Sequence, residues 1–205
     1  MFDKTLLKLT KPAVDRMADA AFTQNVSADQ MTLAALGLGL FGSLLIAVGF
    51  THLALLPLLA GRVADGIDGA IARKVGKQSD RGAFLDIALD FVFYASVPLG
   101  FALYDALNFA LPAAFLLACF VTTGTSFLAY AALAAKRGET STDYPSKGIY
   151  YLGGITEGSE TIGFFVLCCL WPAWFAILAY IYATLCAFTT FTRVKAGWER
   201  FGKTA

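Results

Sequence analysis

The sequence contains few charged residues: 15% of its 205 positions are Asp, Glu, Lys or Arg, against about 25% in an average soluble domain. Apolar residues make up 58% of the chain and include 18 Phe. A soluble protein of this composition would expose large apolar patches and aggregate. The net charge of +1 also gives no general attraction for polyanions. This composition excludes an ordinary soluble globular protein, a disordered chain and a nucleic-acid binder, and it indicates an integral membrane protein.

Histidine and cysteine are scarce, which argues against a zinc or redox centre. The single histidine, His52, is predicted to lie at a turn far from the acidic residues described below, and we assign it no catalytic role. The cysteines all lie within apolar runs, and their spacing matches no zinc-binding or redox motif. We expect them to act as small packing residues. They are Cys119, Cys168, Cys169 and Cys186.

Long apolar segments make up most of the chain. A membrane-spanning helix needs about 20 mostly apolar residues, and six segments meet this requirement. They cover approximately residues 31–50, 52–74, 80–104, 107–134, 147–170 and 172–194. The breaks between them are short and leave no room for a soluble domain. We therefore expect a single all-α membrane domain over residues 1–205, with a bundle of six transmembrane helices over residues 31–194.

Positive charge is concentrated at alternate breaks between these segments. Four Lys or Arg precede the first segment, four lie at or beside the second break and three at the fourth break. Four more lie at the end of the last segment or after it, which leaves only Arg62 of the 16 elsewhere. Lys and Arg resist translocation across the membrane. This distribution therefore predicts that both termini are cytoplasmic, with Arg62 inside the second span.

The segment before the first span, residues 2–22, is amphipathic. Its apolar residues fall roughly on one helical face and charged residues occupy the rest, which is typical of a helix lying in the headgroup plane. A plain soluble tail is the alternative. The apolar face consists of Phe2, Leu6, Leu7, Leu9, Val14, Met17, Ala21 and Phe22. Beyond it, Asn25, Ser27 and Asp29 offer side chains that can cap the first span.

Four carboxylates lie within the second and third spans, where each charge costs about 2.5–3.5 kcal/mol. Asp65 and Asp68 are spaced i, i+3, and Asp86 and Asp90 are spaced i, i+4, so each pair lies on one helix face. The two pairs lie at a similar distance from the basic turn that joins the spans, and we expect them to converge. Converging carboxylates repel one another strongly unless a cation lies among them.

A cluster of carboxylate oxygens is suited to a hard divalent ion such as Mg²⁺, Mn²⁺ or Ca²⁺ rather than zinc. Two such ions bridged by shared carboxylates are a common arrangement for phosphoryl chemistry. Gly66, Gly69 and Gly82 remove side-chain bulk beside the carboxylates, which allows a ligand to approach. For Gly66, simple helix packing is an equally good explanation. The sequence therefore predicts a divalent-metal site at this position.

The four acids belong to a longer motif: Asp65-Gly-Ile-Asp68-Gly69-Ala-Ile-Ala72-Arg73, eight residues, Gly82, three residues, Asp86, three residues and Asp90. It resembles the signature of the CDP-alcohol phosphotransferase (CDP-alcohol phosphatidyltransferase) family and matches all eight of its fixed positions within 26 residues. The predicted topology and amphipathic leader are also similar to that family. The resemblance implies a metal-dependent transferase of phospholipid synthesis, which displaces CMP from a CDP-linked donor with an alcohol hydroxyl.

The resemblance also implies roles for the residues of the motif. Asp65, Asp68 and Asp86 would hold two Mg²⁺ or Mn²⁺ ions, and Asp90 would complete the metal site and act as the base toward the attacking hydroxyl. The CDP pocket would be lined by Gly69, Ala72, Arg73 and Gly82. We expect a homodimer in the inner membrane of a bacterium, with the active site open to the cytoplasm.

Further polar residues lie in or near the spans. Arg62, one turn before Asp65, can neutralise the acidic cluster through an ion pair or contact a substrate phosphate. Glu157 and Glu160 lie on one face of the fifth span, and we expect them to line the acceptor side of the site, because two structural carboxyls would be costly there. The hydroxyls of the fourth span either line the same cavity or join helices. They belong to Thr122, Thr123, Thr125 and Ser126.

The acceptor alcohol is not specified by the sequence. Lys147 and Arg193, predicted near the membrane interface, would suit an acceptor that carries a phosphate, whereas the two Glu would suit one with hydroxyls or an amine. The favoured donor is CDP-diacylglycerol, and the reverse pairing of a CDP-linked small alcohol with diacylglycerol is the alternative. A cation transporter is a third possibility, although we find no inverted repeat or interrupted helix of the kind that transporters often contain.

Overall fold

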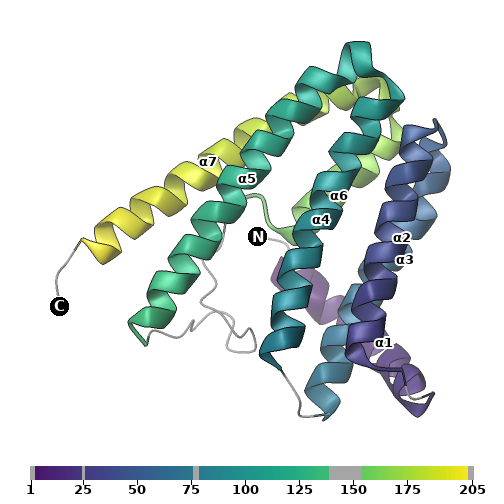
Figure 1. Cartoon of the computed structure of the whole chain (residues 1–205), viewed down its shortest axis with the longest axis vertical. Coiled ribbons are helices and arrows are strands. Elements are labelled where there is room, and N and C mark those ends of the chain that lie inside the picture. Colours follow the sequence, from purple (N-terminus) through teal and green to yellow (C-terminus); the bar gives the residue numbers. More distant parts are fainter. Residues whose placement is uncertain (1–2, 25, 76–78, 139–153, 203–205) are drawn as a thin grey trace.

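The structure is a computed structural model that describes residues 3–24, 26–75, 79–138 and 154–202. These residues are helical and contain no strand, which confirms the predicted all-α class. Figure 1 shows the arrangement of the helices. They are α1 (Asp3–Thr23), α2 (Ala28–Ala47), α3 (Thr51–Val75), α4 (Asp80–Tyr104), α5 (Ala106–Lys136), α6 (Gly158–Leu170), the short 3₁₀ helix η1 (Pro172–Trp174) and α7 (Phe175–Phe201).

Short polar side chains determine where several helices begin. At α2 the Ser27 hydroxyl accepts a hydrogen bond from the Gln30 N–H, and the Gln30 side chain accepts one from the Ser27 N–H, which is a reciprocal capping box. Ser79 caps α4 by accepting from the Gly82 N–H at 3.1 Å, and Asp105 caps α5. The capping role predicted for Ser27 is confirmed, and the breaks near Ser79 and Asp105 lie where the sequence predicted them.

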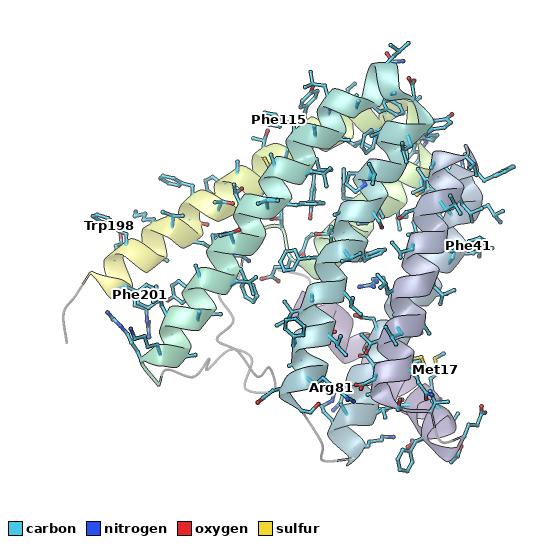
Figure 2. The ribbon with its side chains drawn as sticks, in the orientation of Figure 1. Met17, Phe41, Arg81, Phe115, Trp198 and Phe201 are labelled. Carbon is cyan, nitrogen blue, oxygen red and sulfur yellow. The ribbon has the colours of Figure 1, made fainter. Side chains whose placement is uncertain are left out.

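In the part of the chain that the structure describes, four helical segments are long and apolar enough to cross a membrane, namely α2, α4, α5 and the continuous η1–α7 segment. With 25 residues α3 is about 38 Å long, but charged residues interrupt its apolar character. All five segments begin within three residues of the predicted starts. Large apolar side chains such as Phe41, Phe115 and Trp198 point outward in Figure 2 and are exposed. Such a surface suits lipid rather than water, as expected of an integral membrane protein.

The fifth predicted span differs from the structure. Residues 147–153 lie outside the described part of the chain, and the segment 154–157 is not helical, so α6 begins only at Gly158. Its 13 residues extend over about 20 Å, which is shorter than the bilayer core of about 30 Å. The Glu157 carboxylate accepts a hydrogen bond from the Gly154 N–H at 3.0 Å. This bond stabilises a loop where the sequence predicted a continuous helix, and six complete spans with cytoplasmic termini stay a prediction.

Two groups of helices meet at one end of the molecule (Figure 1). In the first group α2 packs against both α3 and α4, and in the second α5 pairs with α7. The second group leans away from α4 toward the opposite end. Where the groups meet, Phe101 stacks on Phe175 with ring centroids 4.2 Å apart, and Phe109 packs edge-on against Phe175 at 5.1 Å. This aromatic core holds the helices together at the end of α4 that lies farthest from Asp86.

The N-terminal helix α1 lies across one end of α2 and α3 (Figure 1). Ala18 is fully buried in a small apolar cluster with Ile67 and Ile71 of α3, and Lys74 of α3 forms an ion pair with Asp19. The predicted helix is therefore confirmed, but only part of its apolar face is covered by α3. Val14 and Ala21 pack toward α3, whereas the Met17 and Phe22 side chains are exposed.

Candidate functional site

The carboxylates of Asp65, Asp68 and Asp86 converge, as their spacing predicted. One oxygen from each lies within 4.8 Å of the others, and no further residue belongs to this group in the described part of the chain. Asp68 is buried, Asp65 is partly buried and Asp86 is exposed. The three acids, called the Asp triad below, therefore form a site that is buried on one side and open on the other.

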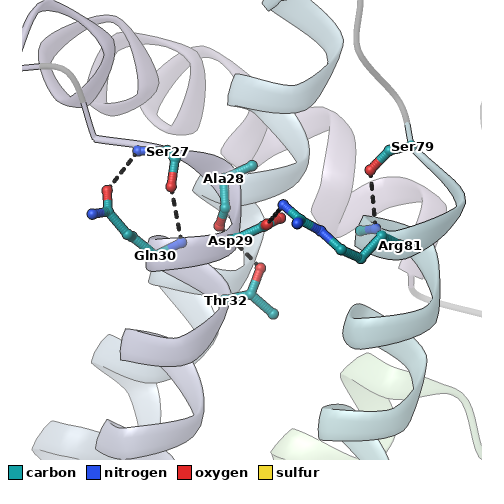
Figure 3. A network of polar contacts seen from close by, with 8 residues as sticks. Ser27, Ala28, Asp29, Gln30, Thr32, Ser79 and Arg81 are labelled. Atoms are coloured by element: carbon teal, nitrogen blue, oxygen red, sulfur yellow. Dashed lines mark hydrogen bonds and ion pairs between the residues drawn. The ribbon is translucent and has the colours of Figure 1, made fainter.

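Helix α2 supports the Asp triad from behind. The sequence predicted α3 and α4 as direct neighbours, but both pack mainly on α2. The Thr32 hydroxyl of α2 lies 2.5 Å from Asp68 Oδ2 and 3.0 Å from the Ala28 carbonyl. At the start of α2, Asp29 forms an ion pair with Arg81 of α4, beside the Ser79 cap (Figure 3). Contacts from α2 thus hold the two acid-bearing helices at a fixed separation.

Asp90 lies next to the Asp triad but is bound by an arginine. Arg62 Nη1 is 2.6 Å from Asp90 Oδ1 and 3.6 Å from Asp65 Oδ2. The predicted ion pair between Arg62 and the acidic cluster is therefore confirmed, although its closest partner is on α4 rather than one turn away on α3. Asp90 lies outside the group of three close carboxylates in the described part of the chain, and its role as a further metal ligand stays a prediction.

A small pocket connects the Asp triad with Asp90. Its polar lining consists of Thr32, Arg62, Asp65, Asp86 and Asp90. Apolar side chains from α2 and α4 complete the wall; they belong to Ala35, Leu36 and Leu89. The pocket thus brings Asp65 and Asp86 of the triad together with the arginine and the fourth carboxylate on one surface.

The residues predicted to bind CDP lie on α3 and α4 close to the open side of the Asp triad. A Cβ on Gly69 would lie 3.2 Å from Arg73 Nη1, so glycine leaves room for the guanidinium. Gly82 is in the first turn of α4, one turn before Asp86. The Arg73 side chain is exposed, and Ala72 and Gly82 are partly buried. That these four positions bind CDP stays a prediction, whereas a Cβ on the neighbouring Gly66 would be in van der Waals contact with Val14 of α1, at 3.8 Å.

Tyr94 was not predicted to be part of the site. It lies one turn after Asp90 on α4, and its hydroxyl is 3.4 Å from the position that a Cβ on Gly158 would take. The start of α6 therefore lies beside the continuation of the site along α4. The sequence does not distinguish Tyr94 from the other seven tyrosines, because its place beside the site depends on a contact between helices that are far apart in the chain.

The two predicted glutamates do not share a helix face. Glu157 is buried and precedes the first residue of α6, where its carboxylate accepts from the Gly154 N–H. Glu160 is in the first turn of α6 and accepts a hydrogen bond from the Ser159 hydroxyl at 3.0 Å. The prediction of an i, i+3 pair on one continuous helix is therefore wrong, because the loop before Gly158 turns Glu157 away from the helical repeat.

Of the two cations predicted on the acceptor side, only Arg193 lies in the described part of the chain. Lys147 lies outside the described residues. Arg193 is buried: its Nη1 donates to the Thr123 carbonyl at 3.2 Å, and its guanidinium lies 5.4 Å from the centre of the Phe127 ring. Arg193 is thus inserted between α5 and α7.

Hydroxyl groups connect α5, α6 and α7. Thr123 bonds to Thr190 at 3.0 Å and Thr161 bonds to Tyr182 at 2.8 Å. Thr122, in contrast, donates to a carbonyl of its own helix. The prediction that hydroxyls of the fourth span join helices is therefore confirmed for Thr123.

Known proteins resemble the chain over most of its length. A family model described as CDP-alcohol phosphatidyltransferase matches residues 25–192. The inner membrane protein YnjF of Escherichia coli (strain K12) is 46% identical over 198 residues, which cover 97% of this chain and 96% of that protein. The archaetidylinositol phosphate synthase of Pyrococcus horikoshii is 31% identical over 103 residues, which cover 50% of this chain and 54% of that protein.

Solved structures share the same fold. The phosphatidylinositol phosphate synthase PgsA1 of Mycobacterium tuberculosis, in complex with manganese and citrate, superposes with a TM-score of 0.71 at 20% identity, covering 90% of this chain and 88% of that one. The same protein with CDP-DAG bound has a TM-score of 0.66 at 18% identity, covering 90% and 93% of the two chains.

Proposed function

Because the chain belongs to the CDP-alcohol phosphatidyltransferase family, and is therefore a transferase of substituted phosphate groups, we propose that it transfers the phosphatidyl group of CDP-diacylglycerol to an alcohol and releases CMP. The proposal rests on the convergence of the Asp triad, with Asp90 held beside it by Arg62. The structure of the M. tuberculosis synthase with CDP-DAG supports this choice of donor.

The Asp triad has the chemistry and spacing that a hard divalent ion requires. Opposite oxygens around an octahedral Mg²⁺ lie about 4 Å apart, since each Mg–O distance is about 2.0–2.1 Å. Three carboxylate oxygens within 4.8 Å need little movement to bind such an ion. Mn²⁺ accepts the same ligands, and the M. tuberculosis synthase has been solved with manganese. We assign Asp65, Asp68 and Asp86 to this metal, which when bound neutralises the donor phosphates and orients them.

Asp90 is our candidate for the base. Its carboxylate lines the pocket beside the Asp triad and would take the proton of the acceptor hydroxyl as that oxygen attacks the phosphorus that carries the diacylglycerol. A P–O bond to the acceptor forms, the P–O bond to the second phosphate breaks, and CMP leaves with the electron pair. Arg62 orients Asp90 through the 2.6 Å contact.

We assign the cytidine diphosphate to the open side of the triad, against Gly69, Ala72, Arg73 and Gly82. The exposed Arg73 guanidinium at this rim can pair with a phosphate. The small size of Gly69 and Gly82 lets the phosphates approach the helix backbones.

The acceptor is assigned to the side of the pocket next to α6. Tyr94 connects Asp90 with the first turn of α6, where Glu160 can accept hydrogen bonds from acceptor hydroxyls. Glu157 would support the loop that precedes this turn. Lys147 and Arg193 stay candidates for a phosphate-bearing acceptor, because a guanidinium or an ammonium binds phosphate well.

We further propose an inner-membrane protein with six spans, cytoplasmic termini and a cytoplasmic active-site opening, as the distribution of Lys and Arg predicts. A homodimer is also expected. Crosslinking in nanodiscs measures the oligomeric state, and recovery of monomer alone would contradict it.

The decisive experiment measures CMP release by the purified protein in lipid nanodiscs with Mg²⁺ or Mn²⁺. CDP-diacylglycerol is supplied with a panel of alcohols, and the reverse pairing uses CDP-linked small alcohols with diacylglycerol. We expect CMP only with CDP-diacylglycerol. The Asp86→Asn variant, which removes one proposed metal ligand without changing side-chain size, is the control and should release less CMP at the same metal concentration. CMP only from the reverse pairing would contradict the assigned donor, and no CMP from any pairing would overturn the proposed function.

A further inference from the structure

The Arg62 guanidinium lies between the two carboxylates that a second metal ion would have to share. Its Nη1 contacts Asp90 Oδ1 at 2.6 Å and Asp65 Oδ2 at 3.6 Å. Sites with two metal ions place them about 3.5–4 Å apart. An ion that extends the Asp triad toward Asp90 would therefore need the same two carboxylates, and Arg62 already holds them.

Packing keeps the guanidinium in this position. It lies over the Phe93 ring at 4.0 Å, and Phe93 is 1% exposed. The ring in turn rests on Gly39 of α2, where a Cβ would lie only 2.5 Å from Phe93 Cδ2. Arg62 Nε is buried and has no hydrogen-bond partner among the described residues. The side chain is therefore confined by a ring on its face and by carboxylates at its end, unlike a mobile surface arginine.

The balance of charge explains what this cation does. Asp65, Asp68, Asp86 and Asp90 carry four negative charges, which two divalent ions would neutralise by themselves. With the Arg62 guanidinium present, one divalent ion leaves a single negative charge, whereas two divalent ions leave a single positive charge. Like charges a few ångströms apart in a partly buried site repel strongly. A second ion is therefore bound more weakly than in the same site without this cation, and further negative charge in the pocket offsets the difference.

We propose that Arg62 acts as an internal cation in place of the second metal ion. The protein without donor binds one divalent ion at the Asp triad, and it binds a second only when the pyrophosphate of a cytidine diphosphate supplies compensating charge. Arg62 is a positioning residue, because it acts through Asp65 and Asp90. This inference rests on the proposed function in one respect, namely that the triad binds a metal.

The experiment measures Mn²⁺ binding to the full chain in nanodiscs, by titration calorimetry and by electron paramagnetic resonance. Wild type is compared with Arg62→Gln, which removes the charge, and with Arg62→Lys, which keeps it. The matched control is Arg137→Gln, because Arg137 also lies over a phenylalanine, 5.0 Å from the Phe201 ring, but donates to the backbone carbonyls of Arg200 and Phe201. A further arm adds CDP to wild type.

Wild type, Arg62→Lys and Arg137→Gln should each bind one Mn²⁺ in the absence of nucleotide. Arg62→Gln should bind a second Mn²⁺ more tightly than wild type by about 5–150-fold, the usual range for coupled ligands. The two ions should give the signal of a spin-coupled pair. CDP should produce the same second binding event in wild type, and Asp90→Asn introduced into Arg62→Gln should remove it.

Two results would overturn the role of Arg62. One is a second-site affinity in Arg62→Gln that stays within about threefold of wild type. The other is a failed CDP test in the wild-type protein: either it binds two Mn²⁺ equally well without CDP, or it binds no second Mn²⁺ when CDP is added. The arm with CDP needs no variant, so the inference is tested even if Arg62→Gln does not fold. If wild type and every variant bind no Mn²⁺, the metal site itself fails, and the proposed function fails with it.

Discussion

Replacing Asp90 with Asn separates the proposed base from the proposed metal ligands. Asn keeps the size of the side chain, and its amide oxygen can still accept the hydrogen bond that Arg62 donates at 2.6 Å. The Asp triad has its three oxygens within 4.8 Å without Asp90. The variant should therefore fold, and it should lose the proton acceptor while it keeps the main metal site.

The expected magnitudes differ between turnover and metal binding. Loss of a positioned general base lowers turnover by about 10²–10⁴-fold, which is about 2.7–5.5 kcal/mol in the activation barrier. The affinity for the first Mn²⁺ should fall by less than about tenfold, because Arg62 already offsets the charge of Asp90 in the wild type. Asp86→Asn should show the opposite pattern, since it removes one of three anionic ligands and weakens Mn²⁺ binding by more than about tenfold.

The assay combines CMP release under saturating CDP-diacylglycerol with Mn²⁺ titration of the same nanodisc samples. Excess metal should recover part of the activity of Asp86→Asn but none of the activity of Asp90→Asn. Normal turnover of Asp90→Asn would refute the reasoning, and so would a defect that disappears in excess metal. In either case the base would have to be another residue of the pocket.

Two further variants test the support that α2 provides. Thr32→Val removes the hydroxyl that contacts Asp68 at 2.5 Å. Loss of a hydrogen bond to a metal ligand lowers metal affinity by about 10–100-fold. Thr32→Ser should retain the affinity in the same Mn²⁺ titration, and equal affinities for Thr32→Val and wild type would contradict the role. Gly39→Ala places a Cβ 2.5 Å from Phe93 Cδ2 and should destabilise the fold by about 1–3 kcal/mol, measured as a lower melting temperature. Gly37→Ala is the control, because the space around Gly37 is open, and it should not lower the melting temperature. Equal melting temperatures for the two variants would show that the Phe93 ring adapts.

Helix boundaries could be predicted wherever local chemistry determines them. The start of α4 follows from the Ser79 cap and the apolar run behind it, and the end of α5 follows from Lys136 and Arg137. The break before α6 could not be predicted, because Gly154, Glu157 and the residues between them are compatible with an apolar helix of the usual period. The loop is held by the bond from the Gly154 N–H to the Glu157 carboxylate and by the bond from the Thr156 hydroxyl to Thr189 of α7.

The convergence of the acids was predictable for a similar reason. The i, i+3 spacing places Asp65 beside Asp68 on one face of α3, and the short turn between the two spans brings Asp86 of α4 to a similar depth. The partners of these acids were not predictable. Thr32 is 36 positions from Asp68, and it is one of many threonines with an apolar neighbour, so nothing in its surroundings singles it out before the helices are packed.

The ion pair of Arg62 shows what a local rule leaves undetermined. The i, i+3 spacing brings Arg62 within 3.6 Å of Asp65, but the shorter contact is to Asp90, 28 positions away. Packing of Phe93 on Gly39 decides between the two, because it fixes the plane on which the guanidinium lies. None of the eight positions of the family motif includes Arg62, Phe93 or Gly39. A chain with the same eight motif residues but without Arg62, Phe93 and Gly39 would keep the proposed metal ligands and lose the proposed internal cation. The motif would then specify which oxygens bind metal, but not how many ions bind before the donor arrives.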